Sequence, residues 1–261
     1  MTDGVVLGIG AGVAAGGMGL LWLLQVRLHD ATAVDVGWAY GIGVLGVLDA
    51  ALGHGAGSQR ALEGVLVAVW SLRLGTFILA RGVLGREHED RRYAEMRARY
   101  GPRANRNFLV FYEAQAALVV AFSVPLLLAS GNRSPHIGLL EWAGVAIVAL
   151  GLGGESLADR QLSAWKADPA HRGRTARVGL WRYSRHPNYF FEWVVWIGFA
   201  VVATPASWGA VGFVTPALLL VLIVFVTGIP PSEKQALASR GEDYRRYQQE
   251  TSAFVPWFPK G

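Results

Sequence analysis

Residues 209–229 read GAVGFVTPALLLVLIVFVTGI, a run of 21 residues without a charged side chain. The hydrocarbon core of a bilayer is about 30 Å thick and takes about 20 mostly apolar residues of α-helix to cross. Because that core holds no water to satisfy the backbone, a crossing segment must make its hydrogen bonds internally. The run therefore predicts a transmembrane helix.

Six further apolar stretches precede this run. Together the predicted spans cover roughly residues 4–26, 34–52, 62–81, 108–130, 137–158, 189–203 and 209–229. With 52% hydrophobic and 16% charged residues, the composition also fits a surface solvated by lipid. We therefore predict an all-α fold, a polytopic membrane helix bundle of about seven transmembrane helices. The first span follows Thr2 and Asp3 rather than a basic segment, so we expect it to be retained.

The basic residues gather in alternate connections of this seven-span chain. All lysines and arginines except Arg60, Arg73 and Arg133 are Arg27 or lie in 81–106, 160–185 and 234–260. Alternate connections share one side of the membrane, and the positive-inside rule makes that side cytoplasmic. This topology accounts for the net charge of +5, so we predict no nucleic-acid partner. We expect a bacterial inner-membrane protein whose cytoplasmic loops form a cofactor pocket.

Glycines mark the first span. Gly4, Gly8, Gly12 and Gly16 share one helical stripe, a pattern that lets helices approach closely in lipid. We predict tight packing there.

The charged segment 85–106 predicts an amphipathic surface helix that ends at Gly101-Pro102. Its charges indicate a solvated face, although Arg81 and the Glu89-Asp90 pair lie close enough to the membrane to reach a pocket.

The sequence gives little support for a metal site or for a catalytic nucleophile. The chain has no cysteine, and its six histidines show no paired helical spacing with carboxylates. We predict no metal site. Ser184 and His186 alone are too generic a pattern for a catalytic triad.

Residues 159–188 combine basic side chains with Trp165, Trp181 and Tyr183 and with several helix breakers. We predict a structured loop. Guanidinium groups interleaved with aromatic rings suit an anionic cofactor that carries phosphates and a ring. The alternative is that these charges only set the topology.

The sequence Arg185-His186-Pro187-Asn188-Tyr189 opens the sixth span, and Glu192 follows one turn later. An asparagine can hold an amide through both a donor and an acceptor, and a carboxylate at this depth is costly. These side chains are candidates for ligand contact. An interfacial anchor belt with a Glu–Arg ion pair is the alternative.

Arg73 lies near the middle of the third span, where an ionisable side chain usually faces a cavity or a partner. The candidate partners on other spans are Asp35, Glu113, Glu155 and Asp159. If they converge, the bundle holds a polar cavity that a lipophilic substrate could enter from the lipid, with Gln115 on its wall. A simple buried ion pair is the alternative.

The motif GLWRYSRHPNYFFEW at 179–193 resembles the steroid 5α-reductase C-terminal-like superfamily, in particular its uncharacterised bacterial branch. DRQL at 159–162, WKADPAHRG at 165–173 and EKQALASRGEDYRRYQQETSAFVPWFP at 233–259 extend the resemblance. Asp35-x-x-Trp38, WSLRL at 70–74 and Gln115 carry it into the first half of the chain.

The resemblance implies an NADPH-dependent membrane reductase of a carbon-carbon double bond in a lipophilic substrate, a steroid-like or isoprenoid-like enone. It implies that residues 1–130 line the substrate cavity and that 131–261 bind the cofactor within one membrane domain. The implied catalytic residues are Asp35, Trp38, Trp70, Arg73 and Glu192. The implied cofactor-binding residues are Arg81, Gln115, Asp159, Lys166, Arg172, Tyr183, Arg185, His186, Asn188, Tyr189, Glu192 and Lys234. Glu233 and Tyr244 match pocket positions by approximate register.

The chain departs from the steroid reductases in two places. Asp35 to Trp38 and Trp70 stand where those enzymes use a Gln-Glu pair and a tyrosine to polarise the enone oxygen. Tryptophan donates one hydrogen bond but cannot deliver a proton, so the oxyanion would be stabilised differently. Phe191 stands where many relatives have glycine, which narrows the space beside the helix.

Two other classes of function remain open. Isoprenylcysteine and phospholipid methyltransferases share a similar Arg-His-Pro-x-Tyr motif and would bind S-adenosylmethionine. A nonenzymatic lipid-binding protein would use the basic loop only to contact anionic headgroups. Asn188 and Glu192 favour the reductase.

Overall fold

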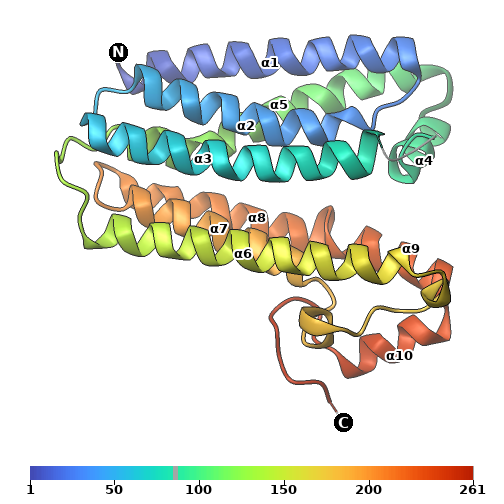
Figure 1. Ribbon diagram of the computed structural model, residues 1–261. Coiled ribbons are helices and arrows are strands. Elements are labelled where there is room, and N and C mark those ends of the chain that lie inside the picture. Colours follow the sequence, from blue (N-terminus) through green and yellow to red (C-terminus); the bar gives the residue numbers. More distant parts are fainter. Residues whose placement is uncertain (85–87, 261) are drawn as a thin grey trace. The chain divides into compact units, whose positions relative to one another are not determined.

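The structure of the protein is a computed structural model that describes residues 1–84 and 88–260. Within these ranges every regular element is a helix (Figure 1). Six helical segments are long and apolar enough to cross a membrane, and a seventh apolar helix has 17 residues. The predicted all-α, multi-pass helix bundle is confirmed.

Helices occupy all seven predicted positions, and shorter helices join or follow them. In chain order the α-helices are α1 Asp3–Leu28, α2 Ala33–Leu52, α3 Gly57–Ile78, α4 Arg91–Tyr100, α5 Ala104–Ser130, α6 Leu139–Ala167, α7 Pro187–Ala203, α8 Val214–Val221, α9 Ile229–Arg240 and α10 Glu242–Glu250. The seventh predicted span is built from η5 (Gly209–Phe213), α8 and a π-helical turn, η6 (Leu222–Val226).

One predicted boundary is wrong. Residues 159–167 were expected in a loop, but α6 continues through Ala167. This stretch, DRQLSAWKA, has no glycine or proline, so nothing in it ends the helix before Asp168-Pro169. The helix therefore carries Asp159 and Lys166 on a regular scaffold.

The chain forms two compact units. Unit 1 consists of Met1–Leu139 with Ala203–Ala210, and unit 2 consists of Leu140–Val202 with the described residues from Val211 onward.

In unit 1, α2 packs closely against its neighbours because glycines leave room for larger side chains. A Cβ on Gly46 would lie 2.7 Å from Val67 Cγ1, and one on Gly43 would overlap the Ser71 hydroxyl. That hydroxyl instead donates to the Ala39 carbonyl at 3.0 Å. Small residues thus bring α2 and α3 into backbone-level contact, as expected for helices in lipid.

The glycine stripe predicted to pack α1 does not do so within this chain. A Cβ on Gly4, Gly8, Gly12 or Gly16 would meet no atom within 4 Å in the part of the chain that the structure describes. The buried residues of α1 form a different stripe, Val6, Gly10, Ala14, Met18 and Gln25. The four glycines therefore make no close contact among the described residues, because α1 turns a different stripe toward α2 and α5.

The amphipathic helix predicted before the fourth span is confirmed as α4. It ends at Gly101, whose φ of 54° is the left-handed conformation that favours glycine. Its one buried residue is Tyr93, and Figure 1 shows the helix at the end of unit 1, crosswise to α1, α2 and α3. Residues 85–87, which begin the predicted helix, lie outside the described ranges.

In unit 2, α6 and α7 run antiparallel and touch at the level of their backbones. A Cβ on Gly144 would lie 2.8 Å from Val202 N, and one on Gly151 would lie 2.8 Å from Val195 N. Gly198 makes the reciprocal approach to Val148 N at 2.8 Å. These close contacts fix the position of α7 along α6. They therefore also fix the position of residues 185–189, where α7 begins.

The last two helices fold back over the start of α7 within unit 2. Ala236 of α9 packs with Tyr244 and Tyr247 of α10, and Gly241 turns the chain between them with φ of 51°. Phe254 in the following segment contacts the rings of Phe190 and Trp193, with centroids 5.7 and 5.8 Å away. The C-terminal segment therefore packs against the first turn of α7.

Candidate functional site

The loop before α7 is anchored on the end of α6. Trp181 Nε1 donates to the Ala158 carbonyl at 2.9 Å, and Leu180 N donates to Gln161 Oε1 at 2.8 Å. Ser184 Oγ then accepts from His186 N at 3.1 Å and donates to the Phe254 carbonyl at 2.7 Å. The motif is held from both sides before the helix begins.

Arg185 is the centre of a charged cluster that we call the Arg185 clamp, formed by Arg185, Glu233 and Gln248. Arg185 Nε donates to Glu233 Oε1 at 2.6 Å, and Gln248 Nε2 donates to Glu233 Oε2 at 2.7 Å. Arg185 Nη1 donates to the carbonyls of Gln248 and Thr251 at 2.9 and 2.5 Å. His186 Nε2 lies 3.4 Å from Glu233 Oε1. The clamp connects the loop to α9, to α10 and to the residue after α10. The Arg185 guanidinium is hydrogen-bonded to these partners within the chain.

Two buried tyrosines of α10 stand beside the clamp. Tyr247 donates its hydroxyl to the carbonyls of Trp181 and Ser184. Burial raises the pKa of Tyr247 above its ordinary value. Burial and the nearby negative charge of Glu233 raise the pKa of Tyr244 to about 12. Both phenols are neutral at physiological pH and act as hydrogen-bond donors.

A second ion-pair group also binds the loop to α10. Arg177 Nη1 lies 2.7 Å from Glu250 Oε2, and its Nη2 donates to the Asp243 carbonyl at 3.0 Å. Thr175 N donates to Asp243 Oδ2 at 2.7 Å. Partial burial raises the pKa of Asp243, but the hydrogen bonds from Thr175 and the charge of Arg177 outweigh it and hold the pKa below its ordinary value.

The first turns of α7 present the side chains that are candidates for ligand contact. Asn188 and Glu192 are four residues apart and so share one face. Asn188 Oδ1 is buried and accepts no hydrogen bond from the residues that the structure describes. Glu192 is 8% exposed and accepts a hydrogen bond from Trp196 Nε1 at 2.8 Å. The ring of Tyr189 stacks on His186 with centroids 5.3 Å apart, and its hydroxyl lies 3.1 Å from Ser232 Oγ.

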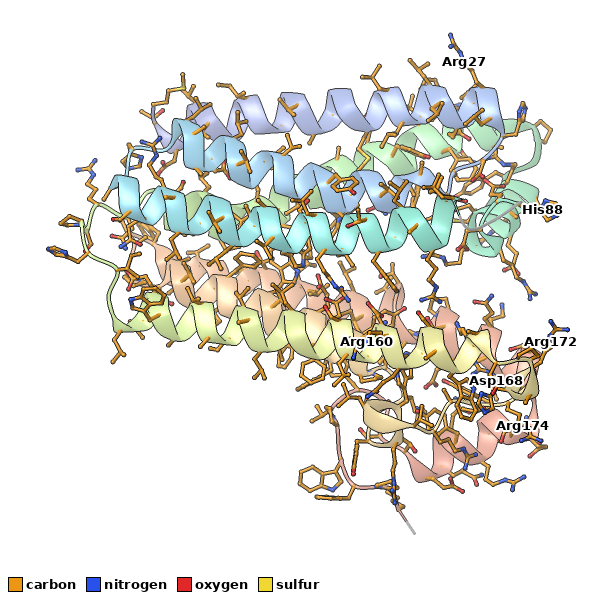
Figure 2. The ribbon with its side chains drawn as sticks, viewed as in Figure 1. Arg27, His88, Arg160, Asp168, Arg172 and Arg174 are labelled. Carbon is orange, nitrogen blue, oxygen red and sulfur yellow. The ribbon has the colours of Figure 1, made fainter. Side chains whose placement is uncertain are left out.

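The remaining predicted site residues of unit 2 differ in how far they are exposed. Asp159 is buried on α6, whereas Lys166, Arg172 and Lys234 are exposed. Tyr183 is half-buried and contacts the ring of Phe258. Figure 2 shows Arg172, together with Arg174, pointing outward from the turn that follows α6. Exposed cations that frame a buried polar group can reach phosphates of a bound anion.

In unit 1 the structure brings together two of the predicted catalytic residues. The rings of Trp38 and Trp70 meet edge to face, with centroids 6.1 Å apart. Trp70 is fully buried. Asp35 is engaged elsewhere, because its carboxylate accepts from Arg92 Nη2 and from the Tyr93 hydroxyl, both at 2.6 Å. Asp35 therefore holds α4 in place.

The predicted basic residues of unit 1 share one aromatic neighbour. The guanidinium carbons of Arg73 and Arg81 lie 5.5 and 5.7 Å from the centroid of the Phe77 ring. Arg73 and Gln115 are half-buried, and Arg81 is exposed. The predicted site residues thus divide between the two units, each set described within its own unit.

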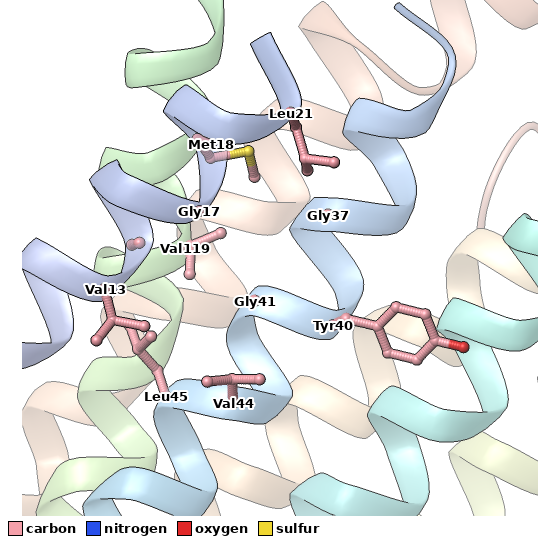
Figure 3. A pocket seen from close by; sticks show the side chains of 11 residues that line it. Val13, Gly17, Met18, Leu21, Gly37, Tyr40, Gly41, Val44, Leu45 and Val119 are labelled. Carbon is pink, nitrogen blue, oxygen red and sulfur yellow. The ribbon is translucent and has the colours of Figure 1, made fainter. Parts of the chain in front are cut away.

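Unit 1 also contains an apolar cavity of about 210 Å³ between α1, α2 and α5. Figure 3 shows Val13, Met18 and Leu21 of α1 and Val44 of α2 around it, whereas the ring of Tyr40 points away from α1. The cavity exists because Gly17, Gly37 and Gly41 place no side chain there.

Sequence reasoning missed most of the clamp. Glu233 was placed near a pocket by register alone, and Gln248, Thr251 and the Phe254 carbonyl were not singled out. The only signal in the sequence is the polar, tyrosine-containing pattern of α10, which cannot specify a partner 63 residues away.

Comparisons with known proteins identify the family. Residues 21–251 match the family described as "Protein of unknown function (DUF1295)", so the chain belongs to that family. A relative from Schizosaccharomyces pombe, "Uncharacterized protein C594.04c", is 24% identical over 265 residues, covering 91% of this chain and 76% of its own length. No solved structure matches the chain significantly.

Proposed function

We propose that this protein is an NADPH-dependent membrane reductase of a carbon-carbon double bond in a lipophilic enone. The resemblance of residues 179–193 to the steroid 5α-reductase C-terminal-like superfamily, in particular its uncharacterised bacterial branch, supports the cofactor class. The positive-inside pattern supports a cytoplasmic cofactor site in a bacterial inner membrane.

One observation carries the proposal, the buried Asn188 Oδ1 at the start of α7. A buried acceptor without a donor is costly, so such an atom calls for a donor from a ligand or a water. The carboxamide of a nicotinamide offers an N–H donor to this oxygen and an acceptor for the Asn188 amide. The residues present therefore fit the nicotinamide end of NADPH.

The other groups of unit 2 fit the rest of the cofactor. Lys166, Arg172 and Lys234 supply cations for its phosphates, and Tyr183 supplies a ring. Arg185 and His186 are positioning residues in this proposal, because the clamp holds them against Glu233. NADPH would supply the hydride. Glu192 shares the helical face of Asn188, and Asp159 on α6 remains a predicted cofactor contact.

Trp38, Trp70 and Arg73 of unit 1 are the catalytic residues that the resemblance implies. Tryptophan N–H and guanidinium groups can donate hydrogen bonds to a developing enolate oxygen. Asp35 supports them indirectly through α4. Arg81 and Gln115 remain predicted cofactor contacts.

The test is a side-by-side binding assay of the purified protein in detergent with NADPH and with S-adenosylmethionine. We expect saturable NADPH binding that Asn188→Leu weakens by roughly 5- to 100-fold, because a lost hydrogen bond to a buried group is worth about 1–3 kcal/mol. Asn188→Asp, which keeps a carboxyl oxygen at this position, should lose less. Asn105→Leu, at an exposed asparagine of unit 1, is the control.

Three outcomes decide the proposal. Folded protein that binds no NADPH contradicts it. Binding of S-adenosylmethionine alone replaces it with the methyltransferase alternative. Equal NADPH binding by wild type and Asn188→Leu removes Asn188 from the site.

A further inference from the structure

The cationic end of unit 1 contains arginines in two different states. Within α4, Arg91 pairs with Glu95 at 2.8 Å, Arg92 pairs with Asp35 at 2.6 Å, and Arg97 pairs with Glu89 at 2.8 Å. Their charges are compensated inside the unit. Arg92 and Arg97 also hold α4 against the rest of unit 1, through Asp35 and through Gln25 Oε1 at 3.0 Å.

A second set of arginines has no such partners in the part of the chain that the structure describes. We call Arg27, Arg99, Arg103 and Arg106 the arginine collar. All four are exposed. None of their side chains makes a hydrogen bond or ion pair within residues 1–84 and 88–260. Their donors are available to a ligand that comes from outside the chain.

Two collar residues, Arg27 and Arg106, come from helix ends that lie side by side. Trp22 Nε1 donates to the Asn105 carbonyl at 2.8 Å, which places the end of α1 beside the beginning of α5. Arg27 follows Trp22 by little more than one turn, and Arg106 is next to Asn105. Arg103 ends the short turn Gly101–Arg103 that leads into α5, and Arg99 lies in the last turn of α4 just before this turn. Figure 2 shows Arg27 pointing away from the helices of unit 1.

Exposed apolar side chains lie within a turn of the collar. Leu23 and Leu24, one turn before Arg27, are 50% and 42% exposed, and Val110, one turn after Arg106, is 66% exposed. They belong to helices long and apolar enough to cross a membrane. A ligand that satisfies both features has an anionic head and a hydrocarbon tail.

We propose that the arginine collar is a binding site for anionic phospholipid headgroups. Guanidinium groups bind phosphate oxygens with paired hydrogen bonds, and arginines beside the membrane surface are drawn to anionic lipid. The adjacent Leu23, Leu24 and Val110 favour lipid over free phosphate, because only the lipid brings acyl chains to them. Trp22, with its ring near this level, is the side chain expected at a headgroup boundary. This site is independent of the proposed cofactor site.

The experiment measures lipid retention by the full-length, delipidated protein in detergent, using native mass spectrometry and thermal stability. The probes are phosphatidylglycerol, phosphatidylcholine with the same acyl chains, and inorganic phosphate. We expect phosphatidylglycerol to be retained and stabilising, and the other two to be markedly weaker. The variant Arg99→Gln/Arg103→Gln/Arg106→Gln should lower apparent affinity for phosphatidylglycerol by roughly 10- to 100-fold.

The matched control is Arg91→Gln, which removes an exposed arginine of the same helix whose charge Glu95 already compensates. We expect it to retain phosphatidylglycerol like the wild type. Arg27→Gln removes one collar residue from a different helix and should lose roughly fivefold. This single variant keeps the test decisive if the triple variant unfolds.

The proposal is overturned if phosphatidylcholine or inorganic phosphate matches phosphatidylglycerol. It is also overturned if a folded collar variant retains phosphatidylglycerol like the wild type. Equal losses of phosphatidylglycerol affinity in Arg91→Gln and Arg27→Gln would show that only the total charge matters. The collar would then not be a specific binding site.

Discussion

The paired arginines of unit 2 and the collar arginines of unit 1 differ in what they bind. In unit 2, Arg177 and Arg185 donate to carboxylates and main-chain carbonyls of the C-terminal helices and the segment after them. In unit 1, the collar arginines have no such partners among the described residues. An arginine that is fully paired fixes backbone segments, whereas an unpaired one keeps its donors for a ligand. Sequence position alone does not separate these two roles.

The glycines between α6 and α7 and those on the outer stripe of α1 show the same contrast. Gly144, Gly151 and Gly198 of unit 2 meet backbone atoms of the opposite helix. The stripe that includes Gly12 in α1 meets nothing within unit 1. A small residue permits close packing only when a second helix uses the space.

The largest expected effect comes from breaking the Arg185 clamp. Arg185→Leu leaves the Glu233 carboxylate, whose side chain is 15% exposed, without its cation. Removing one partner of a buried ion pair costs about 3–5 kcal/mol. We expect a loss of this order in the free energy of unfolding, measured by denaturant unfolding in detergent.

Arg103→Leu is the matched change in unit 1, and it should alter stability by no more than about 0.5 kcal/mol in the absence of lipid. The double variant Arg185→Leu/Glu233→Leu should recover part of the loss, because it removes the stranded charge. Equal effects of Arg185→Leu and Arg103→Leu would erase the distinction between paired and unpaired arginines.

An intermediate effect is expected at the glycines. The Cβ added by Gly151→Ala would lie 2.8 Å from Val195 N and 2.9 Å from Phe191 O, so α6 and α7 must separate. Overpacking of this kind costs about 1–3 kcal/mol. Gly12→Ala should cost nothing, since its Cβ meets open space. Thermal unfolding of the two variants in one detergent compares them, and a loss in Gly12→Ala would indicate a partner helix outside this chain.

The smallest effect concerns Asp243, whose folded-state pKa lies below its ordinary value of 3.8. A lowered carboxyl pKa contributes stability above the ordinary value, and this contribution is lost as the pH falls through the folded pKa. We therefore expect the wild type to lose stability below about pH 4. Asp243→Asn should lack this part of the pH dependence. Glu242→Gln, an exposed neighbour on α10, is the control, and identical acid profiles for all three proteins would contradict the assignment.

Much of the fold could be predicted from the sequence because the bilayer imposes a simple rule. The uncharged run at 209–229 and the other apolar stretches fix where helices form, since each must satisfy its own backbone. The end of α6 could not be placed this way, because residues 159–167 leave the apolar pattern while still favouring a helix. The packing face of α1 was also misjudged, since small residues on several stripes looked equally suitable.

The candidate site was predictable only in part. The shared face of Asn188 and Glu192 follows from helical spacing on α7. The pairing of Asp35 with Arg92 and Tyr93 does not, because it depends on how α4 returns across unit 1. The engagement of Arg185 by Glu233 likewise needs α9 to fold back on the loop.

The sequence by itself determined that this protein is a multi-pass helical membrane protein and which segments carry its charge. Hydropathy and charge are local properties, and the bilayer converts them directly into helices. Only the tertiary structure decided which arginines are clamped, which remain open, and which glycines are contacts. Those roles depend on partners far away in the chain, and a side chain's type does not specify its partner.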